Sequence, residues 1–211
     1  MRSPTAPATA PDPVQDRCLV IACGAIVPEI QAVMAQAGLV NIDITAVPAT
    51  YHNRPERIAP AVARRIAQGR ARGYTRLFVA YADCGTRGDL DKLLAAERID
   101  RLPGAHCYAF FSGVEAFAIR ADEDVTSFYL TDFLCRHFDA LVIRGLGLDR
   151  HPELLPLYFG NYERLIYLSQ APTSDLFARA ETAAATLGLA FMHRPVGYGD
   201  LRPALVKADG G

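Results

Sequence analysis

Three cysteines and a histidine stand where the sequence predicts that strands give way to helices. Cys23 and Cys84 each end an apolar run and are each followed by glycine. His52 follows another such run, and Cys107 lies near a fourth. Because the carboxyl ends of parallel strands meet at one edge of a sheet, we expect these four side chains to converge on one crevice.

Thiolate and imidazole groups suit Zn²⁺ or another late transition metal such as Fe, and three cysteines could also hold an iron–sulfur cluster. Ligands far apart in sequence are typical of catalytic sites on α/β scaffolds, whereas zinc fingers have closely spaced pairs. His106, next to Cys107, could replace either Cys107 or His52 as the ligand. A single cysteine can instead be buried apolar filling, and we favour that interpretation for Cys18 and Cys135.

Several polar residues beside these positions are candidates for catalysis. Arg54 could clamp a substrate carboxylate or phosphate. Glu56 is either a catalytic acid or an ordinary acidic residue in the first turn of a helix. Asp83 could be a general base, a partner of a ligand histidine, or a residue that caps the following turn.

Gly24, Gly85 and Asn53 are the candidates for contacts with a cofactor. The segment 85–88 is a glycine-flanked loop before a helix, so its amides could bind an anion. It lacks the Lys-Ser/Thr pair of a P-loop. Each glycine that follows a cysteine has a second interpretation, because it could serve only to permit a tight turn.

The segments that position these residues alternate between strand and helix. We expect strands at 17–24, 42–47, 77–82, 105–111, 165–168 and 189–192, and helices at 28–34, 57–72, 88–98, 115–121, 151–160 and 174–187. This alternation predicts an α/β fold built on a mostly parallel, doubly wound, Rossmann-like sheet with helices on both faces.

The chain has 211 residues, of which 51% are apolar and 21% charged, so it can bury a core of ordinary size. We expect a disordered tail at 1–16, a single α/β domain at 17–206, and a short tail at 207–211. Two halves that meet near 113–127 are the alternative to the single domain.

Charge and hydropathy argue against several functional classes. The formal net charge is −1 and no basic stripe is present, which argues against nucleic acid as a partner. No apolar run approaches the roughly 20 residues of a membrane span. The N-terminal segment lacks an apolar signal core, so we expect a cytoplasmic protein with a small-molecule substrate. The five cysteines are an odd number without short disulfide spacing, which favours free thiols, a metal or a catalytic cysteine.

Four motifs together carry a family resemblance: Ala22-Cys23-Gly24, His52-Asn53-Arg54-Pro55-Glu56, Tyr81-Ala82-Asp83-Cys84-Gly85 and His106-Cys107. With Phe128-Tyr129-Leu130-Thr131 and Tyr158-Phe159-Gly160-Asn161-Tyr162, the chain resembles the uncharacterised domain of unknown function 1638 family over most of residues 17–170. The family has no settled activity. The resemblance implies an association with corrinoid-dependent methyltransferases of one-carbon metabolism, and hence a corrinoid protein or a methyltransferase as a partner.

This sequence departs from the pattern of that family in two places. Asp83 precedes the third-strand cysteine, and Thr86-Arg87 separate two glycines where many members have glycines throughout. His106-Cys107 is one residue shorter than the His-Asp-Cys motif of the family, which leaves open which of the two residues matches its ligand.

Three hypotheses for function follow. The first is a metalloenzyme, a transferase or hydrolase, in which a Cys/His-bound Zn²⁺ (or Fe) activates a thiol, a water or a carbonyl. The second is a non-catalytic accessory protein that holds a metal, an iron–sulfur cluster or a corrinoid for a partner methyltransferase. The third is a metal-free enzyme with Cys84 as nucleophile and His52 or His106 as base. We favour them in that order.

Overall fold

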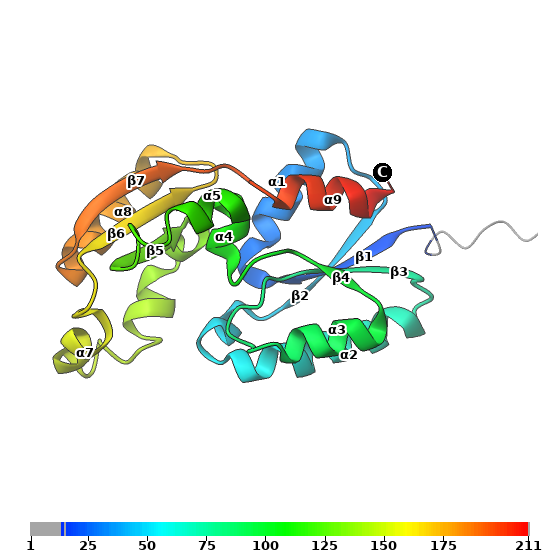
Figure 1. Cartoon of the computed structure of the whole chain (residues 1–211), viewed down its shortest axis with the longest axis horizontal. Helices are drawn as coiled ribbons and strands as arrows, with labels where there is room; N and C mark the ends of the chain where they lie inside the picture. Colours follow the sequence, from blue (N-terminus) through cyan, green and yellow to red (C-terminus); the bar gives the residue numbers. More distant parts are fainter. Residues whose placement is uncertain (1–13, 15, 211) are drawn as a thin grey trace, which may run out of the picture.

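The computed structural model describes residue 14 and residues 16–210, and it contains two sheets in which every strand pairing is parallel (Figure 1). The first sheet has the order β2-β1-β3-β4 and the second β5-β6-β7. The strands are β1 (Cys18–Cys23), β2 (Ile42–Val47), β3 (Arg76–Ala80), β4 (Asp100–Arg101), β5 (Ser127–Thr131), β6 (Arg164–Ser169) and β7 (Ala190–Pro195). The α/β class with parallel strands is therefore confirmed, although the strands form two sheets and not one.

Helices cover both faces of the first sheet. α1 (Val27–Ala37) and α9 (Leu201–Asp209) lie on one face, and α2 (Ile58–Ala71) and α3 (Asp89–Glu97) lie on the other (Figure 1). The centre of β1 is buried from both sides, since Val20 faces the α1 side, Ile21 faces the α2 side, and both have 0% exposure. A continuous apolar run is what a strand covered on both faces requires.

The order of strands in the first sheet creates a switch point between β1 and β3. The connection from β1 to β2 runs through α1 on one face, whereas the connections from β2 to β3 and from β3 to β4 run through α2 and α3 on the other. In open α/β sheets, ligands bind outside the carboxyl ends of the strands at such a point. A doubly wound, Rossmann-like arrangement of the whole chain stays a prediction.

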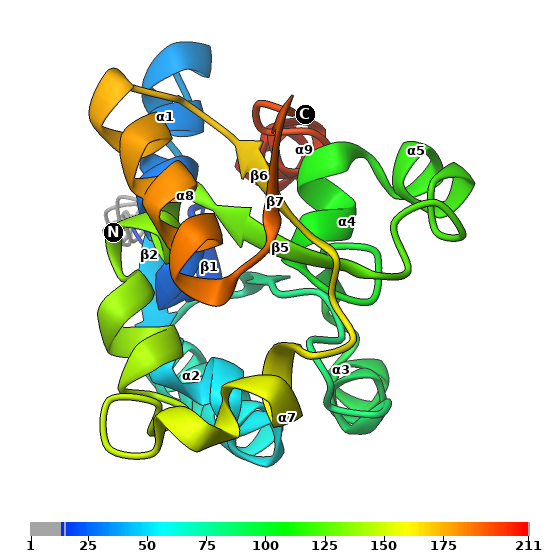
Figure 2. The same cartoon turned by 90° about the vertical axis from the view of Figure 1, so that its left-hand side faces the viewer.

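The second sheet has its own core. Leu165 and Tyr167 of β6 pack with α8 (Ser174–Leu187), while α4 (Cys107–Ser112) contacts β6 from the other face (Figure 2). Below, the first half means the first sheet with its helices, and the second half means the second sheet with its helices. The second half also contains shorter helical segments: α5 (Val114–Ile119), α6 (Asp132–Arg136), η4 (Asp139–Ile143), η5 (Pro152–Leu154) and α7 (Leu155–Phe159). The first half also contains η1 (Gly24–Ile26), η2 (Ala49–Asn53) and η3 (Pro55–Arg57).

The strand expected at 105–111 is wrong. Residues 107–112 form α4, and the fourth strand of the first sheet is the two-residue β4. Phe110 and Phe111 are both 1% exposed, because α4 lies between the two halves and is covered on several sides. A short apolar run buried in this way has no period that separates helix from strand.

The last helix of the described chain packs on the first sheet. α9 packs against α1 and β1, and the backbone amide of Asn41 donates to Asp209 Oδ1 at 2.7 Å. Residues 207–209 therefore belong to α9, although the sequence predicted a tail from 207. Most of the tail expected at 1–16 lies outside the described residues. The division of 17–206 into one domain or two halves meeting near 113–127 stays a prediction.

Among the helices that the structure describes, none combines the length and the apolar character needed to cross a lipid bilayer.

Candidate functional site

Three cysteines and one histidine line a small cavity at the carboxyl edge of the first sheet. Cys23 is the last residue of β1, His52 lies in η2 after β2, Cys84 follows β3, and Cys107 begins α4. The cavity has a volume of about 40 Å³ and largely apolar walls. Side chains separated by up to 84 positions thus share one cavity (107 − 23), while their role as metal ligands stays a prediction.

The four side chains line this cavity without meeting at one point. Among residues 14 and 16–210, no group of three or more Cys, His, Asp or Glu side chains is arranged to hold a metal ion as the side chains stand. Binding of an ion by these residues would therefore require rotation of side chains around the cavity.

The environment of the thiols keeps them protonated at neutral pH. The pKa of Cys84 is raised to about 12, mainly by burial and in part by the neighbouring Cys23 thiol. Burial also raises the pKa of Cys23, and that of Cys107 lies well above its usual range because of burial and the charges of Cys84 and Cys23. Backbone amides, including that of Cys107 beside the Cys84 sulfur, lower these values only in part. A thiolate in this cavity needs a cation beside it.

Cys84 is held in an unusual backbone conformation by the loop that follows it. Its φ is +50° and that of Arg87 is +56°, in the left-handed region that side chains disfavour. Asp83 supports this loop: its Oδ1 accepts from the Thr86 hydroxyl at 2.7 Å and from the Gly88 amide at 3.1 Å, and its Oδ2 accepts from the Arg87 amide at 3.3 Å. Strain of this kind persists where surrounding contacts enforce it.

Of the roles considered for Asp83, the structure shows the capping one. Partial burial acts to raise its pKa, but the hydrogen bonds from Thr86 and the loop amides outweigh burial, so that the pKa lies below the usual value. The amides of Arg87 and Gly88 are used by this carboxylate, and that of Thr86 donates to the Asp83 carbonyl at 3.0 Å. Binding of an anion by these amides would have to displace the bonds to Asp83. A cofactor contact at Gly85 stays a prediction.

Gly24 has a packing role. A Cβ at this position would lie 3.1 Å from the Val47 carbonyl oxygen and 3.3 Å from the Ala49 nitrogen, so that glycine permits the end of β1 to lie against the end of β2. Asn53 Nδ2 donates to the Leu141 carbonyl at 3.1 Å and thereby links the first half to η4 of the second. Contacts of Gly24 and Asn53 with a cofactor stay predictions.

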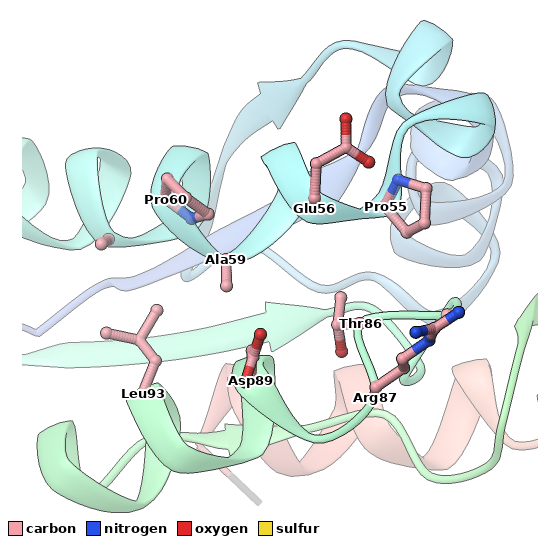
Figure 3. Close-up of a pocket in the computed structure, with 10 residues that line it drawn as sticks. Pro55, Glu56, Ala59, Pro60, Thr86, Arg87, Asp89 and Leu93 are labelled. Carbon is pink, nitrogen blue, oxygen red and sulfur yellow. The ribbon is translucent and has the colours of Figure 1, made fainter.

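The two charged residues of the segment after His52 lie on the surface. Arg54 is exposed, and Glu56 of η3 is exposed at a separate pocket of about 680 Å³, opposite Arg87 and Asp89 (Figure 3). Neither side chain lines the cavity of the thiols. A catalytic role for Arg54 or Glu56 stays a prediction.

His106 and Cys107 face different spaces. Cys107 lines the small cavity with Cys23 and Cys84, whereas His106 lines an open cleft of about 580 Å³ between the two halves. His52, Cys84 and Cys107 border both spaces, so that the cleft leads to the thiols. Desolvation by the surrounding protein lowers the pKa of both His106 and His52, although part of His52 remains exposed.

Sequence reasoning missed the residues that the second half contributes. Phe133 and Leu134 of α6 close the small cavity, and Ser127, Tyr129 and Tyr162 line the cleft. Tyr81 was also missed as a site residue; it is 2% exposed and its hydroxyl faces the Cys23 thiol. The aromatic residues of 128–131 and 158–162 were the available signal, since they belonged to the motifs that carried the family resemblance.

A family model described as "Protein of unknown function (DUF1638)" matches residues 46–205. The matched segment contains His52, Cys84 and Cys107, and it begins after Cys23. No curated protein and no solved structure matches the chain.

Proposed function

The chain belongs to the DUF1638 family, and we propose that it is a metal-dependent enzyme that binds Zn²⁺ or iron at the carboxyl edge of its first sheet. The proposed ligands are the thiols of Cys23, Cys84 and Cys107, with His52 as the nitrogen ligand. The observation that carries the proposal is that four donors from four separate strand-to-helix junctions line one cavity. A small-molecule substrate is proposed to enter through the adjoining cleft.

The chemistry of the donors fits such an ion. Sulfur and imidazole nitrogen are the ligands that Zn²⁺ and iron take in proteins, and metal binding replaces the protons that burial keeps on these thiols. When bound, such an ion would supply a Lewis acid that activates a coordinated water, thiol or carbonyl. Asp83 would fix the loop that presents Cys84, and the apolar walls would exclude bulk water from the donors.

The metal-free cysteine mechanism has less support. A nucleophilic cysteine requires a lowered pKa, and the pKa of Cys84 is raised to about 12 by burial and by Cys23. In the described part of the chain, neither His52 nor His106 forms a hydrogen bond with the Cys84 sulfur.

The accessory hypothesis differs from the enzyme in the access that it requires. A storage or carrier site needs no route for a substrate, whereas Cys84 and Cys107 border an open cleft of about 580 Å³. This favours turnover. A role beside a corrinoid protein or a methyltransferase in one-carbon metabolism is the proposed context, and it rests on family resemblance alone.

Elemental analysis of protein purified without oxygen tests the proposal. We expect about one zinc or iron ion per chain. Cys107→Ser should lower the metal content severely, while Cys135→Ser should leave it unchanged, because Cys135 is buried in the second half and donates to the Leu176 carbonyl at 3.1 Å. Far less than one ion per chain in the unmodified protein would contradict the proposal. In protein that contains zinc and no iron, a visible absorption band would favour the corrinoid-binding alternative, and acid-labile sulfide together with iron would favour the iron–sulfur alternative.

A further inference from the structure

The cleft between the two halves has features that restrict its ligand. Its first wall contains Cys84 and Cys107, and its second wall contains Ser127, Tyr129 and Tyr162. At about 580 Å³ it has the size of sites that enclose small molecules. Because it adjoins the thiols, a ligand bound here would present one end to them.

The lining of the cleft carries one carboxylate, and that carboxylate is already neutralised. Asp124 is 6% exposed, and its two oxygens accept from Arg194 at 2.6 and 3.1 Å. The Tyr129 hydroxyl also donates to Asp124, at 3.0 Å. Among the described residues, no lysine or arginine lines the cleft. An anionic ligand such as a phosphate would find no cation here, and a cationic ligand would have to compete with Arg194 for Asp124.

Two buried polar atoms on the wall of the cleft lack hydrogen-bond partners in the described part of the chain. They are Ser127 Oγ, in a residue that is 6% exposed, and His106 Nδ1. A buried polar atom without a partner costs free energy, and such atoms in a native fold call for an explanation. Neither atom has accessible surface, so a ligand with both a donor and an acceptor would satisfy them only after the Ser127 and His106 side chains rotate toward the cleft.

Aromatic rings form much of the remaining surface. Tyr108 packs against His106 and Tyr129 with centroid separations of 5.1 and 5.2 Å, and Phe117 lies 5.4 Å from Tyr129. Their contacts hold the rings in place, so that they offer a rigid apolar surface. Flat conjugated molecules pack well on such rings.

We propose that this cleft binds an uncharged, flat ring compound that carries a hydrogen-bond donor and an acceptor. The ring packs on Tyr108 and Tyr129, and the polar groups bond to Ser127 Oγ and His106 Nδ1 once these two side chains rotate toward the cleft. This inference names the ligand class of the proposed active site, so it rests on the proposed function for its catalytic meaning. The binding itself does not require the metal.

Three probes that share one pyridine ring test the proposed charge preference. Nicotinamide is uncharged and has an amide donor and acceptor, nicotinate is an anion, and 1-methylnicotinamide is a cation. Binding of each to the full-length protein is measured by calorimetry and by ligand-observed NMR, before and after treatment with a chelator. We expect saturable binding of nicotinamide in both states, and binding of the two charged probes that is weaker by about tenfold or more.

A matched pair of serine variants locates the binding. Ser127→Ala should weaken nicotinamide binding by roughly five- to tenfold, the effect of one lost hydrogen bond. Ser112→Ala is the control, because Ser112 Oγ is also buried without a partner among the described residues but does not line the cleft. It should leave the affinity unchanged.

Tighter binding of nicotinate or 1-methylnicotinamide, no saturable binding of nicotinamide, or equal effects of the two serine variants would overturn the inference. The metal content of the same samples reports separately on the proposed function. Loss of nicotinamide binding with full metal content counts against the ligand class alone, and absence of metal with intact binding counts against the metalloenzyme alone.

Discussion

The two sheets differ at the carboxyl ends of their strands, where parallel folds place their ligands. At the edge of the second sheet, Asp132 is 1% exposed and accepts hydrogen bonds from the Tyr167 hydroxyl at 2.7 Å and from the amides of Gln170 at 3.2 Å and Ala171 at 2.8 Å. The Gln170 side chain also bonds to Asp132, because its Oε1 accepts a hydrogen bond from the Asp132 amide at 3.0 Å. This polar group is fully engaged by its own chain.

The edge of the first sheet is the opposite case. His106 Nδ1 is buried without a hydrogen-bond partner among residues 14 and 16–210, the buried Tyr81 hydroxyl faces the Cys23 thiol, and the thiols of Cys23, Cys84 and Cys107 are desolvated. Both edges hold buried polar side chains at equivalent places in parallel sheets. The difference is consistent with a stabilising role for the second edge and with the binding role proposed for the first.

The largest expected effect is on stability at the second edge. Asp132→Ala would leave the Tyr167 hydroxyl and two buried amides without an acceptor, which should lower the free energy of unfolding by about 4 kcal/mol. In the metal-free protein, Cys23→Ala should lower the free energy of unfolding by only about 1 kcal/mol. Urea unfolding of both variants measures this contrast.

Asp122→Ala is the control for loss of a carboxylate, because Asp122 is exposed. It should change the free energy of unfolding by no more than about 0.5 kcal/mol. If Cys23→Ala cost more than Asp132→Ala in metal-free protein, the assignment of stability to the second edge would be inverted.

A buried acid where the two halves meet predicts a pH dependence of stability. Glu29, in the first turn of α1, is 5% exposed, and burial, with a further contribution from Asp132, raises its pKa to about 7 against the opposing effect of Arg136. Between its unfolded pKa near 4.5 and pH 7, the unfolded chain loses this proton and the folded chain keeps it. Stability should therefore fall as the pH rises through this range and level off above it.

Glu29→Gln should remove that fall. The variant should match the unmodified protein at pH 4 and exceed its free energy of unfolding by about 3 kcal/mol at pH 8, which unfolding by urea at the two pH values measures. Glu123→Gln, at an exposed position, controls for the general loss of a negative charge. An equal gain at pH 4 and pH 8 would show that ionisation of Glu29 is not the cause.

The smallest expected effect concerns the reactivity of Cys84 in metal-free protein. Because its pKa is about 12, Cys84 has a far smaller thiolate fraction at pH 8 than an ordinary cysteine. The thiolate of a cysteine with a higher pKa is a stronger nucleophile, but this offsets only part of the loss. Alkylation of Cys84 should be slower than that of a free cysteine by roughly 50-fold. Site-resolved mass spectrometry over time measures the rate, and the same protein in denaturant provides the ordinary rate. Fast, selective labelling of folded Cys84 would favour the cysteine-nucleophile hypothesis.

The sequence was sufficient for the local elements and for the direction in which they run. Segments 17–24, 42–47 and 77–82 read as strands and formed β1, β2 and β3, because buried strands carry apolar runs of characteristic length. Strand and helix alternate, and such connections place successive strands parallel. Cys23, His52 and Cys84 therefore follow strands at one edge, which alternation alone could predict.

Cys107 came to the same cavity for a different reason. The segment around it is a helix that packs between the halves, and no local pattern distinguishes that from a strand. The alternation of strand and helix did not decide between one sheet and two, since a break between sheets leaves each local pattern unchanged; two halves that meet near 113–127 were only the alternative to a single domain.

The sequence by itself determined an α/β chain with parallel strands and thiols at strand ends, because periodicity and chain direction are local properties. Only the tertiary structure decided that Ser127, Tyr129 and Tyr162 lie opposite Cys84 and Cys107 across a cleft. The tertiary structure also decided which buried polar groups have hydrogen-bond partners and which do not. Both depend on how distant segments pack against each other, and long-range packing leaves no period in the sequence.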